Sequence, residues 1–477
     1  MAEGVADLHT NLVADLGVDA VLNERADLEK YENGWRYGSG KAGMVVRPSS
    51  TEGVSRVLAI THALGVRVVA QGANTGLVGA SVPDGSGEML VLSLERLNHR
   101  IEIDILDRTV RVEGGVLLSQ LNAALAEHGL VFPVDLGADP QIGGMIATNT
   151  GGTRLLKYGD VRHNLLGIEV VLADGTVINA MKGLRKDNTG LDLKHLFTGT
   201  FGAFGVVTQA VLNVVPLPCQ RATALVGCGN GEAALALLRT LEHRGIEILT
   251  AFEVISAEAL RAVFAHQPRL RNPYGHTELP AYTVLVELAS TLRDTTLDLS
   301  GFLEEVLAAH LEGDGGESIS EVFLLKPEEA WEIRHHISES LRSEGYVLGL
   351  DISVPRSKMP AFTEAVTAWL TGTHPGVRVC DFGHWGDGGT HLNLVWQPEA
   401  VAIPREAMVA EIQRKVYDLA VHEFGGSFSA EHGVGPHNQG FYDAYTPETT
   451  QNVCAVLKQF FDPAGRLGTV RLARLGA

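Results

Sequence analysis

The alternation of apolar and polar residues predicts strands and helices in turn along the early part of the chain. Met44–Val46 is a short apolar run, and Val66–Ala70 is a second one. Between them Ser49 and Glu52 form a capping box, and Gly65 ends the predicted helix. The apolar face of this helix consists of Val54, Val57, Leu58 and Leu64. The order predicts a strand–helix–strand unit.

A similar pattern recurs farther along the chain. It has a strand at Thr109–Glu113, a helix at Leu117–His128 and a further strand at Leu166–Leu172. Prolines then mark a change of character, so we expect a domain boundary near residue 217. Beyond it, Glu328–Leu341 has helical periodicity, with Trp331, Ile337 and Leu341 as core candidates. The segment 435–477 is expected to be largely helical.

Composition narrows the classes of function. The 477 residues carry 38 Lys and Arg against 57 Asp and Glu, a formal charge of −19. This balance argues against binding to nucleic acid or to an anionic membrane, because both need basic surfaces. The four cysteines form no C-x-x-C pair, so neither an iron–sulfur cluster nor a zinc ribbon is expected. We see no leader peptide and no apolar stretch of about 18 residues, and we expect a cytoplasmic protein without a transmembrane segment.

Glycine is over-represented, with 54 copies, and it clusters in three segments. Residues 71–79 follow a predicted strand but open no helix, so they are not the dinucleotide fingerprint G-x-G-x-x-G. Alone, this segment is better explained as a tight turn. Residues 135–159 and 199–205 are similar, however, and three such segments in one domain favour a long ligand lying along bare backbone. A flavin dinucleotide fits that description.

These segments, with 185–190 and 192–194, resemble in order and spacing the flavin-binding domain of the vanillyl-alcohol-oxidase superfamily. The branch that they resemble contains D-2-hydroxyglutarate, D-lactate and glycolate dehydrogenases, and the similarity extends to about residue 465. The resemblance implies an α+β fold with a two-subdomain, PCMH-type FAD-binding domain at 1–217. It also implies an α+β substrate (cap) domain with an antiparallel sheet and the metal site at 218–434. A C-terminal helical segment, 435–477, would return to the FAD domain.

Covalent relatives often attach flavin to a histidine in the first glycine-rich segment, and this chain has none there, so we expect non-covalent FAD. The resemblance assigns FAD contacts to Gly72, Ala73, Asn74, Thr75, Gly76, Leu77, Gly79, Ala80, Ser81, Pro133, Asp135, Leu136, Gly137, Ile142, Gly143, Gly144, Ala147, Thr148, Asn149, Gly151, Gly152, Tyr158, Gly205 and Val206.

Histidines and a carboxylate gather in two later segments. His384 and His391 are seven residues apart, which would put them on opposite faces of a straight strand, but the glycines between them permit a turn. Glu431 and His432 follow some forty residues on. Two imidazoles and a carboxylate suit Zn²⁺ or a similar divalent ion. By itself, the His384–His391 pair is as well explained by a pair of surface histidines, since the chain has 18.

The resemblance gives these residues roles: His384, His391 and Glu431 would bind the metal, His432 would be the catalytic base and would contact the substrate, and Asn393 would contact the substrate.

Arg334 and Ser338 are four residues apart on the predicted helix 328–341 and would share one face. A solvated face is the ordinary explanation of such a pair, but the resemblance implies that they hold the substrate carboxylate. Asp387 is interpreted as a turn-former.

The chain departs from the family pattern at several positions. Gly349 stands where the hydroxyglutarate enzymes carry a carboxylate-binding lysine, and Phe201 stands where a glutamate is usual. The residues at 436–438 and 467–470 also differ from the family's. We expect the same fold in spite of these changes, but they widen the range of possible substrates.

The leading hypothesis is an FAD-dependent dehydrogenase that oxidises a D-2-hydroxy acid, with D-2-hydroxyglutarate as first choice. D-lactate, glycolate or a bulkier 2-hydroxy acid is the alternative. Two further hypotheses are a flavin-free metal-dependent hydrolase and a degenerate flavoprotein that acts as a scaffold. The resemblance also implies a homodimer, and electrons would pass to an external acceptor such as an electron-transfer flavoprotein or a quinone.

Overall fold

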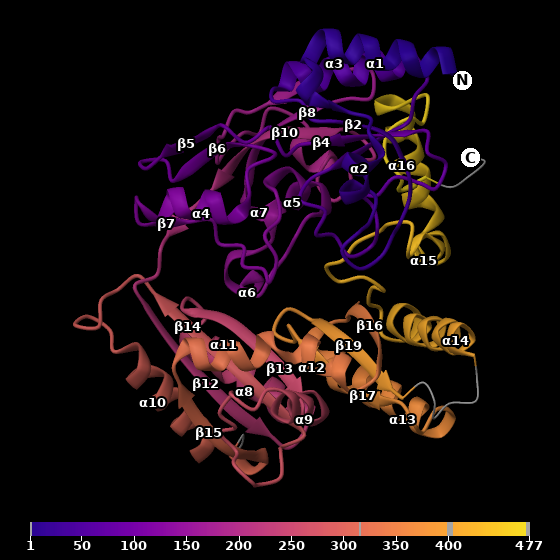
Figure 1. Ribbon diagram of the computed structural model, residues 1–477. Coiled ribbons are helices and arrows are strands. Elements are labelled where there is room, and N and C mark those ends of the chain that lie inside the picture. The colour runs from indigo at the N-terminus through magenta and orange to yellow at the C-terminus, as the bar shows by residue number, and fades with distance from the viewer. Residues whose placement is uncertain (1, 314–315, 398–403, 474–477) are drawn as a thin grey trace. The chain divides into compact units, whose positions relative to one another are not determined.

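The computed structural model describes residues 2–313, 316–397 and 404–473 (Figure 1). They form two compact units, each built from helices and sheets, which confirms the α+β class. Unit 1 contains the chain up to residue 152, residues 159–217 and the chain from 431 on, and unit 2 contains residues 153–158 and 218–430. The chain thus enters unit 2 after Leu217 and leaves it after Ala430, four residues before the end expected for the second domain.

The first sheet of unit 1 has four strands in the order β1-β2-β4-β3. The predicted strand–helix–strand unit is present: α3 connects β2 to β3, and both strands run parallel to β4, which lies between them. Helix α1 packs beside α3 (Figure 1). The bounds of these elements are α1 Ala2–Leu16, β1 Val21–Leu22, α2 Arg25–Leu28, β2 Ala42–Val46, α3 Thr51–Ala63, β3 Val68–Gln71 and β4 Met89–Ser93.

Helix α3 begins one residue later than the capping-box prediction. Its N-cap is Ser50, whose side chain accepts a hydrogen bond from the Gly53 N–H, so the prediction of Ser49 as the cap is wrong. Val54, Val57 and Leu58 are buried as expected. Leu64 lies past the end of the helix and is 42% exposed, so it does not belong to the core face.

The second sheet of unit 1 is antiparallel throughout, in the order β5-β6-β10-β8-β9. The predicted helix after β6 is present as α4, but the next strand, β7, pairs with β11 outside this sheet. The elements of this part are β5 Ile101–Asp104, β6 Thr109–Glu113, α4 Leu118–Ala126, β7 Leu130–Val131, α5 Ile142–Thr148, α7 Val161–Asn164, β8 Leu165–Val171, β9 Val177–Ala180, β10 Val206–Asn213 and β11 Val215–Pro216.

The C-terminal part of the chain completes unit 1 with α15 (Gln439–Tyr445) and α16 (Glu448–Phe461). Lys458 of α16 donates to the carbonyl oxygen of Ala203 at 2.7 Å, and Leu467 forms a bridge to Val68 of β3. In the described part of the chain, no helix has the length and apolar character needed to cross a membrane.

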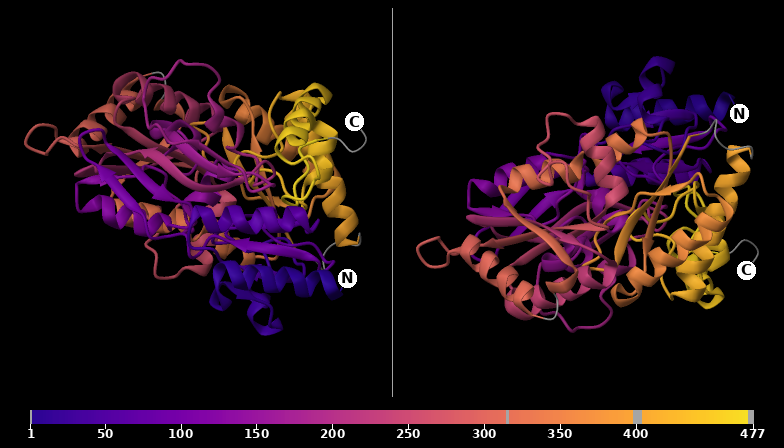
Figure 2. Two further views of the ribbon diagram at one scale, coloured as in Figure 1. Left: turned by 90° about the horizontal axis from the view of Figure 1, so that it is seen from above. Right: turned by 90° about the horizontal axis from the view of Figure 1, so that it is seen from below.

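Unit 2 is built on one large antiparallel sheet, in the order β15-β12-β14-β13-β18-β19-β16, with β17 beside β19. Its strands are the magenta to orange arrows in the right-hand view of Figure 2. Helices α9, α11 and α12 supply the side chains that cover one face, and α8 and α10 pack on β12 and β14. The bounds are α6 Leu155–Tyr158, β12 Gln220–Cys228, α8 Gly231–Gly245, β13 Leu249–Ser256, α9 Ala257–His266, β14 Tyr282–Ser290, α10 Leu299–Glu312, β15 Ile319–Leu325, α11 Pro327–His335, α12 Ile337–Ser343, β16 Tyr346–Ser353, α13 Met359–Thr373, β17 Arg378–Val379, β18 Phe382–Gly383, β19 Gly389–Trp396 and α14 Arg405–Asp418.

The helix predicted at Glu328–Leu341 is two helices, α11 and α12. His336 separates them with φ −84° and ψ −3°, close to the bridge region of backbone space. Trp331, Ile337 and Leu341 are all buried, as predicted.

Candidate active site

The strands of unit 2 place several functional side chains on one face of the sheet. Register pairs Phe382 of β18 with His391 of β19, and His391 with Asp351 of β16. Directly paired residues of an antiparallel sheet point to the same face. Asn393, two residues after His391, therefore shares this face.

His384 and His391 meet because they do not lie on one strand. β18 ends at Gly383, the chain turns through residues 384–388, and β19 begins at Gly389 and runs back. The two imidazole rings are 5.2 Å apart, centroid to centroid. The side chain of Asp387 accepts from the N–H of Gly389 at 3.0 Å, which is the turn-forming contact expected of it.

A buried carboxylate, Glu253 of β13, contacts two of the predicted site residues. Its side chain is 1% exposed, and its two oxygens lie 2.5 Å from Nδ1 of His384 and 2.7 Å from Nε of Arg334. Burial alone would raise the pKa of this carboxyl, but His384 and Arg334 outweigh it and hold the pKa well below the usual range. The guanidinium of Arg334 also lies 4.4 Å from the ring centre of Phe382.

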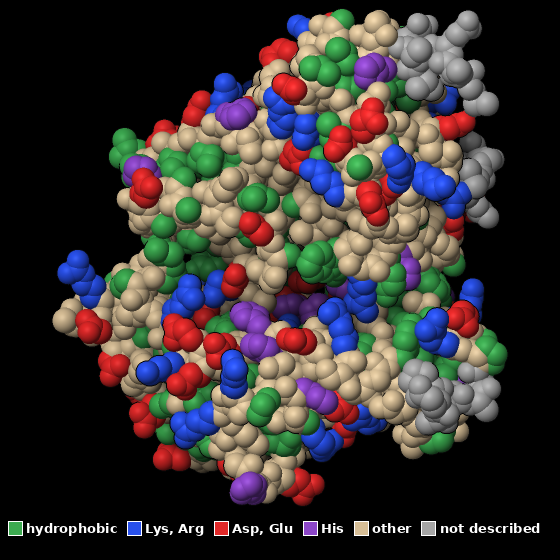
Figure 3. Space-filling model, in the orientation of Figure 1, with side chains coloured by type: hydrophobic (Ala, Val, Ile, Leu, Met, Phe, Trp, Pro, Cys, Tyr) green, Lys and Arg blue, Asp and Glu red, His purple; other side chains and the backbone are tan. Residues whose placement is uncertain are grey.

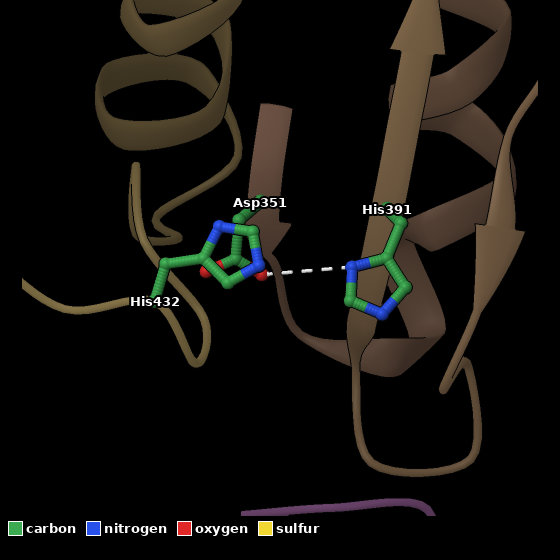
Figure 4. Close-up of side chains that lie close together, drawn as sticks. All are labelled: Asp351, His391 and His432. Atoms are coloured by element: carbon green, nitrogen blue, oxygen red, sulfur yellow. Dashed lines mark ion pairs between the residues drawn. The ribbon is translucent and has the colours of Figure 1, made fainter. Parts of the chain in front are cut away.

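Two groups of side chains in this region have the chemistry of a metal site. The donor atoms of His384, His391 and Glu431 lie within 4.8 Å of one another, and so do those of Asp351, His391 and His432. Figure 4 shows the second group, in which Nδ1 of His391 is 3.9 Å from an oxygen of Asp351. His391 belongs to both groups. Glu431 and His432 are consecutive, so they approach it from one short segment.

The sequence interpretation missed Asp351 and Glu253. Each is the one acidic residue of a largely apolar strand, β16 and β13, and both are at most 5% exposed. Because burial of an unpaired charge is costly, an acidic residue in a buried strand was the available signal. Their partners lie far away in the sequence, so pattern alone could not name them.

Ser338 does not share a face with Arg334. The break at His336 places them on different helices, with Arg334 buried on α11 and Ser338 exposed on α12. Asn393 is 9% exposed, and its amide donates to the carbonyl oxygen of His391 at 3.0 Å. Its partner across β16 is Gly349, the position of the family lysine.

In unit 1 the first glycine-rich segment is an ordered loop after β3. Asn74 has a φ of 57°, and its side-chain amide donates to the carbonyl oxygen of Asn33 at 2.7 Å. The hydroxyl of Ser81 donates to the side-chain oxygen of Asn74 at 2.8 Å, and the side-chain amide of Gln71 donates to the carbonyl oxygen of Ser81 at 2.8 Å. The loop is therefore shaped by its own hydrogen bonds.

Apart from Gly151, the glycines of the expected FAD site are of two kinds. At one kind an added Cβ would lie within 3.2 Å of other atoms, and these are Gly72, Gly79, Gly143, Gly152 and Gly205. At Gly152 φ is also 123°, and the Cβ would lie 2.5 Å from the carbonyl oxygen of Asp135. At the other kind, Gly76, Gly137 and Gly144, a Cβ would meet nothing within 4 Å.

Two loops and the first turn of α5 thus leave bare backbone beside open space, as a diphosphate cradle requires, and unit 1 fits FAD. Every expected FAD contact except Tyr158 lies in unit 1. Ile142 and Val206 are each 1% exposed, so only their backbone is suited to a cofactor contact.

Phe201 is one of four non-glycine residues with positive φ in the described chain, at 55°. Its ring fills the space beside Gly433, where an added Cβ would lie 2.1 Å from a ring carbon. Gly433 has a φ of 77°, so the turn expected after His432 does use the left-handed conformation.

Comparisons with known proteins agree with this architecture. A family described as "FAD binding domain" matches residues 42–181, and one described as "FAD linked oxidases, C-terminal domain" matches residues 217–470. A mitochondrial D-2-hydroxyglutarate dehydrogenase of Danio rerio is 35% identical, over 90% of this chain and 78% of its own. A D-2-hydroxyglutarate–pyruvate transhydrogenase of Saccharomyces cerevisiae is 30% identical, over 95% of this chain and 91% of its own.

The fold is also that of a solved alkyldihydroxyacetonephosphate synthase, with a TM-score of 0.72 over 99% of this chain and 85% of the synthase, at 16% identity.

Two expectations change. The relatives of Danio rerio, Bos taurus and Rattus norvegicus are named as mitochondrial, which contradicts the expectation of a cytoplasmic protein. A flavin-free hydrolase is contradicted by the two FAD family matches, at residues 42–181 and 217–470. The chain belongs to the FAD-linked oxidases, as an FAD-dependent oxidoreductase of the branch that contains the D-2-hydroxyglutarate dehydrogenases.

Proposed function

We propose that this flavoenzyme oxidises D-2-hydroxy acids to 2-oxo acids, and that it holds them at a divalent metal bound by His384, His391 and Glu431. The observation that carries the metal is the approach of these three donors to within 4.8 Å of one another. Two imidazoles and one carboxylate leave a coordination position for substrate, and this donor set suits Zn²⁺. The names of the relatives support the substrate class.

The chain's own residues have separate tasks in this reaction. When bound, the metal would lower the pKa of the 2-hydroxyl, and FAD would accept the hydride from C2. His432 takes the hydroxyl proton, since the unprotonated nitrogen of a neutral imidazole can accept it. Arg334 pairs with the carboxylate beside the reacting carbon, and Asn393 orients the substrate.

D-2-hydroxyglutarate is the first choice of substrate, because the relatives of Danio rerio and Bos taurus are named for it. Gly349 favours a second candidate. Without a lysine opposite Asn393, the second carboxylate of hydroxyglutarate lacks the partner that the family supplies. D-lactate, glycolate or a bulkier monocarboxylate would not need that partner.

The test is a comparison of kcat/KM for D-2-hydroxyglutarate, D-lactate, glycolate and an apolar D-2-hydroxy acid, with a dye as electron acceptor and the L-isomers of the three chiral acids as controls. Turnover of any of the four acids supports the proposal, and the ranking selects between the two candidates. Failure of all of them, in protein that carries FAD, would leave a flavoprotein scaffold as the better hypothesis.

We also infer an external electron acceptor. The yeast relative is named as a transhydrogenase with pyruvate, so a 2-oxo acid joins electron-transfer flavoprotein and quinones as a candidate. Reoxidation of the reduced enzyme by each of these, followed in a stopped-flow instrument, separates them. We further expect a homodimer, which light scattering tests.

A further inference from the structure

Glu253 is a buried carboxylate that the reaction described above does not use. It lies on β13, in the middle of the large sheet of unit 2, with its side chain 1% exposed. The neighbouring residues of the strand, Phe252 and Val254, are apolar and buried. Taking a carboxylate out of water costs several kcal/mol, so its partners must compensate for the burial.

Both partners are groups to which the proposed function gives a role. One oxygen lies 2.5 Å from Nδ1 of His384, and the other accepts from Nε of Arg334 at 2.7 Å. In the tautomer that fits this contact, Nδ1 of His384 donates its proton to the carboxylate oxygen. This leaves Nε2 of His384 as the nitrogen with a lone pair for a metal.

The same contact orients Arg334. Its Nε is held by Glu253 and its guanidinium lies on the Phe382 ring, 4.4 Å from the centroid. The planar group is therefore fixed in two directions, and its terminal amino groups are the part left to pair with a substrate carboxylate. The Phe382 ring also lies 5.3 Å from the ring of His391, so the arginine and both histidines form one packed group.

We propose that Glu253 is a positioning residue that holds the metal ligand His384 and the carboxylate-binding Arg334 in their working orientations at once. The inference rests on the proposed function of those two residues. Its consequence is that metal binding and substrate binding are coupled through one carboxylate, because both depend on the orientation of Glu253.

The chain provides a matched control in Glu287. This carboxylate is also fully buried, on the adjacent strand β14, and it accepts from Arg154 at 3.2 Å. It also accepts from Trp331 of α11, the helix that carries Arg334, at 2.8 Å. Its hydrogen-bond partners Arg154, Thr250 and Trp331 are not residues proposed to bind metal or substrate. A merely structural role would make the two carboxylates behave alike.

The experiment compares Glu253→Gln with Glu287→Gln in the full-length holoprotein. A glutamine offers one acceptor oxygen to two donors, so one of the two contacts of residue 253 is lost. We expect Glu253→Gln to weaken Zn²⁺ binding by roughly 10–100-fold, measured by competition with a chelator, and to raise KM at saturating Zn²⁺. The flavin spectrum should not change. Glu287→Gln should lower Tm and leave the Zn²⁺ affinity as in the unmodified protein.

A second variant covers the case in which Glu253→Gln does not fold. In Glu253→Gln combined with Arg334→Met, the amide oxygen can accept from His384 and no arginine is left without its anion. We expect this protein to bind Zn²⁺ within a few-fold of the unmodified affinity, while KM stays high because the arginine is gone.

His384→Ala separates the two proposals. If it binds Zn²⁺ as the unmodified protein does, the proposed metal site is wrong. If it loses Zn²⁺ while Glu253→Gln keeps both normal affinity and normal KM, the metal site stands and the role of Glu253 is overturned.

Discussion

The site residues of unit 2 gain their chemistry from neighbours that are distant in sequence. His384 is oriented by Glu253, 131 residues earlier, and Asp351 lies opposite His391 on the adjacent strand. A substitution at His384 should therefore affect metal binding and activity without disturbing the flavin unit.

Substitution of a proposed metal ligand tests whether metal binding and activity depend on these histidines. His384→Ala and His391→Ala should each lose bound metal by more than the roughly 10–100-fold expected for a supporting residue, and turnover should fall with it. FAD content should stay normal, since the flavin loops belong to unit 1. Elemental analysis beside the visible spectrum measures both. Normal turnover in metal-free variants would show that the histidines do not act through a metal.

Gly349 allows a test in the opposite direction. Its φ is not positive, so a side chain suits the backbone. Gly349→Lys should restore a cation facing the site and lower KM for D-2-hydroxyglutarate about tenfold, as one charge-assisted hydrogen bond of roughly 1.5 kcal/mol predicts. The KM for D-lactate should fall little. Equal effects on both acids would mean that residue 349 does not meet the second carboxylate.

Asp381 gives a prediction about pH. Burial raises its pKa from 3.8 to about 6. Between about pH 4 and pH 6 the unfolded chain releases this proton while the folded protein keeps it. The free energy of unfolding therefore falls as the pH rises through this range. Below about pH 4 the carboxyl is protonated in both states and costs no stability. Asp381→Asn should be more stable than the unmodified protein above pH 6, by up to roughly 3 kcal/mol, and equal near pH 4. Urea unfolding at both values measures this. A gain that is independent of pH would contradict the assignment.

At the scale of elements, local pattern predicted the strands and helices well and tertiary pairing poorly. The unit from β2 to β3 and the buried face of α3 follow from periodicity, which depends only on neighbouring residues. The meeting of His384 and His391 was predictable once glycines implied a turn. The roles of Glu253 and Asp351 were not, because register among strands far apart in sequence decides which side chains face them.

The corrected start of α3 can be tested directly. Ser50→Ala removes the side-chain acceptor of the Gly53 N–H and should cost about 1 kcal/mol of unfolding free energy. Ser49→Ala, one residue earlier, should change it by no more than a few tenths. If chemical denaturation showed the larger loss of unfolding free energy for Ser49→Ala, the N-cap would be Ser49 instead.

At the scale of the whole molecule, charge and family agree on a small-molecule enzyme. Acidic and basic side chains are interspersed over the face shown in Figure 3, and the net charge of −19 disfavours a polyanionic partner. The two FAD family matches, at residues 42–181 and 217–470, fall on both units, so both belong to one enzyme of this class.

In the reaction that we propose, a D-2-hydroxy acid reduces the bound flavin with the help of a metal. The most direct test adds D-2-hydroxyglutarate, and then D-lactate, to the anaerobic holoenzyme and follows the visible flavin band before and after removal of metal by a chelator. We expect at least one D-acid to bleach the flavin band and its L-isomer to leave it unchanged. Bleaching should be lost without metal and restored by Zn²⁺. A flavin band that bleaches equally in metal-free protein, or that no D-2-hydroxy acid bleaches, would contradict this proposal.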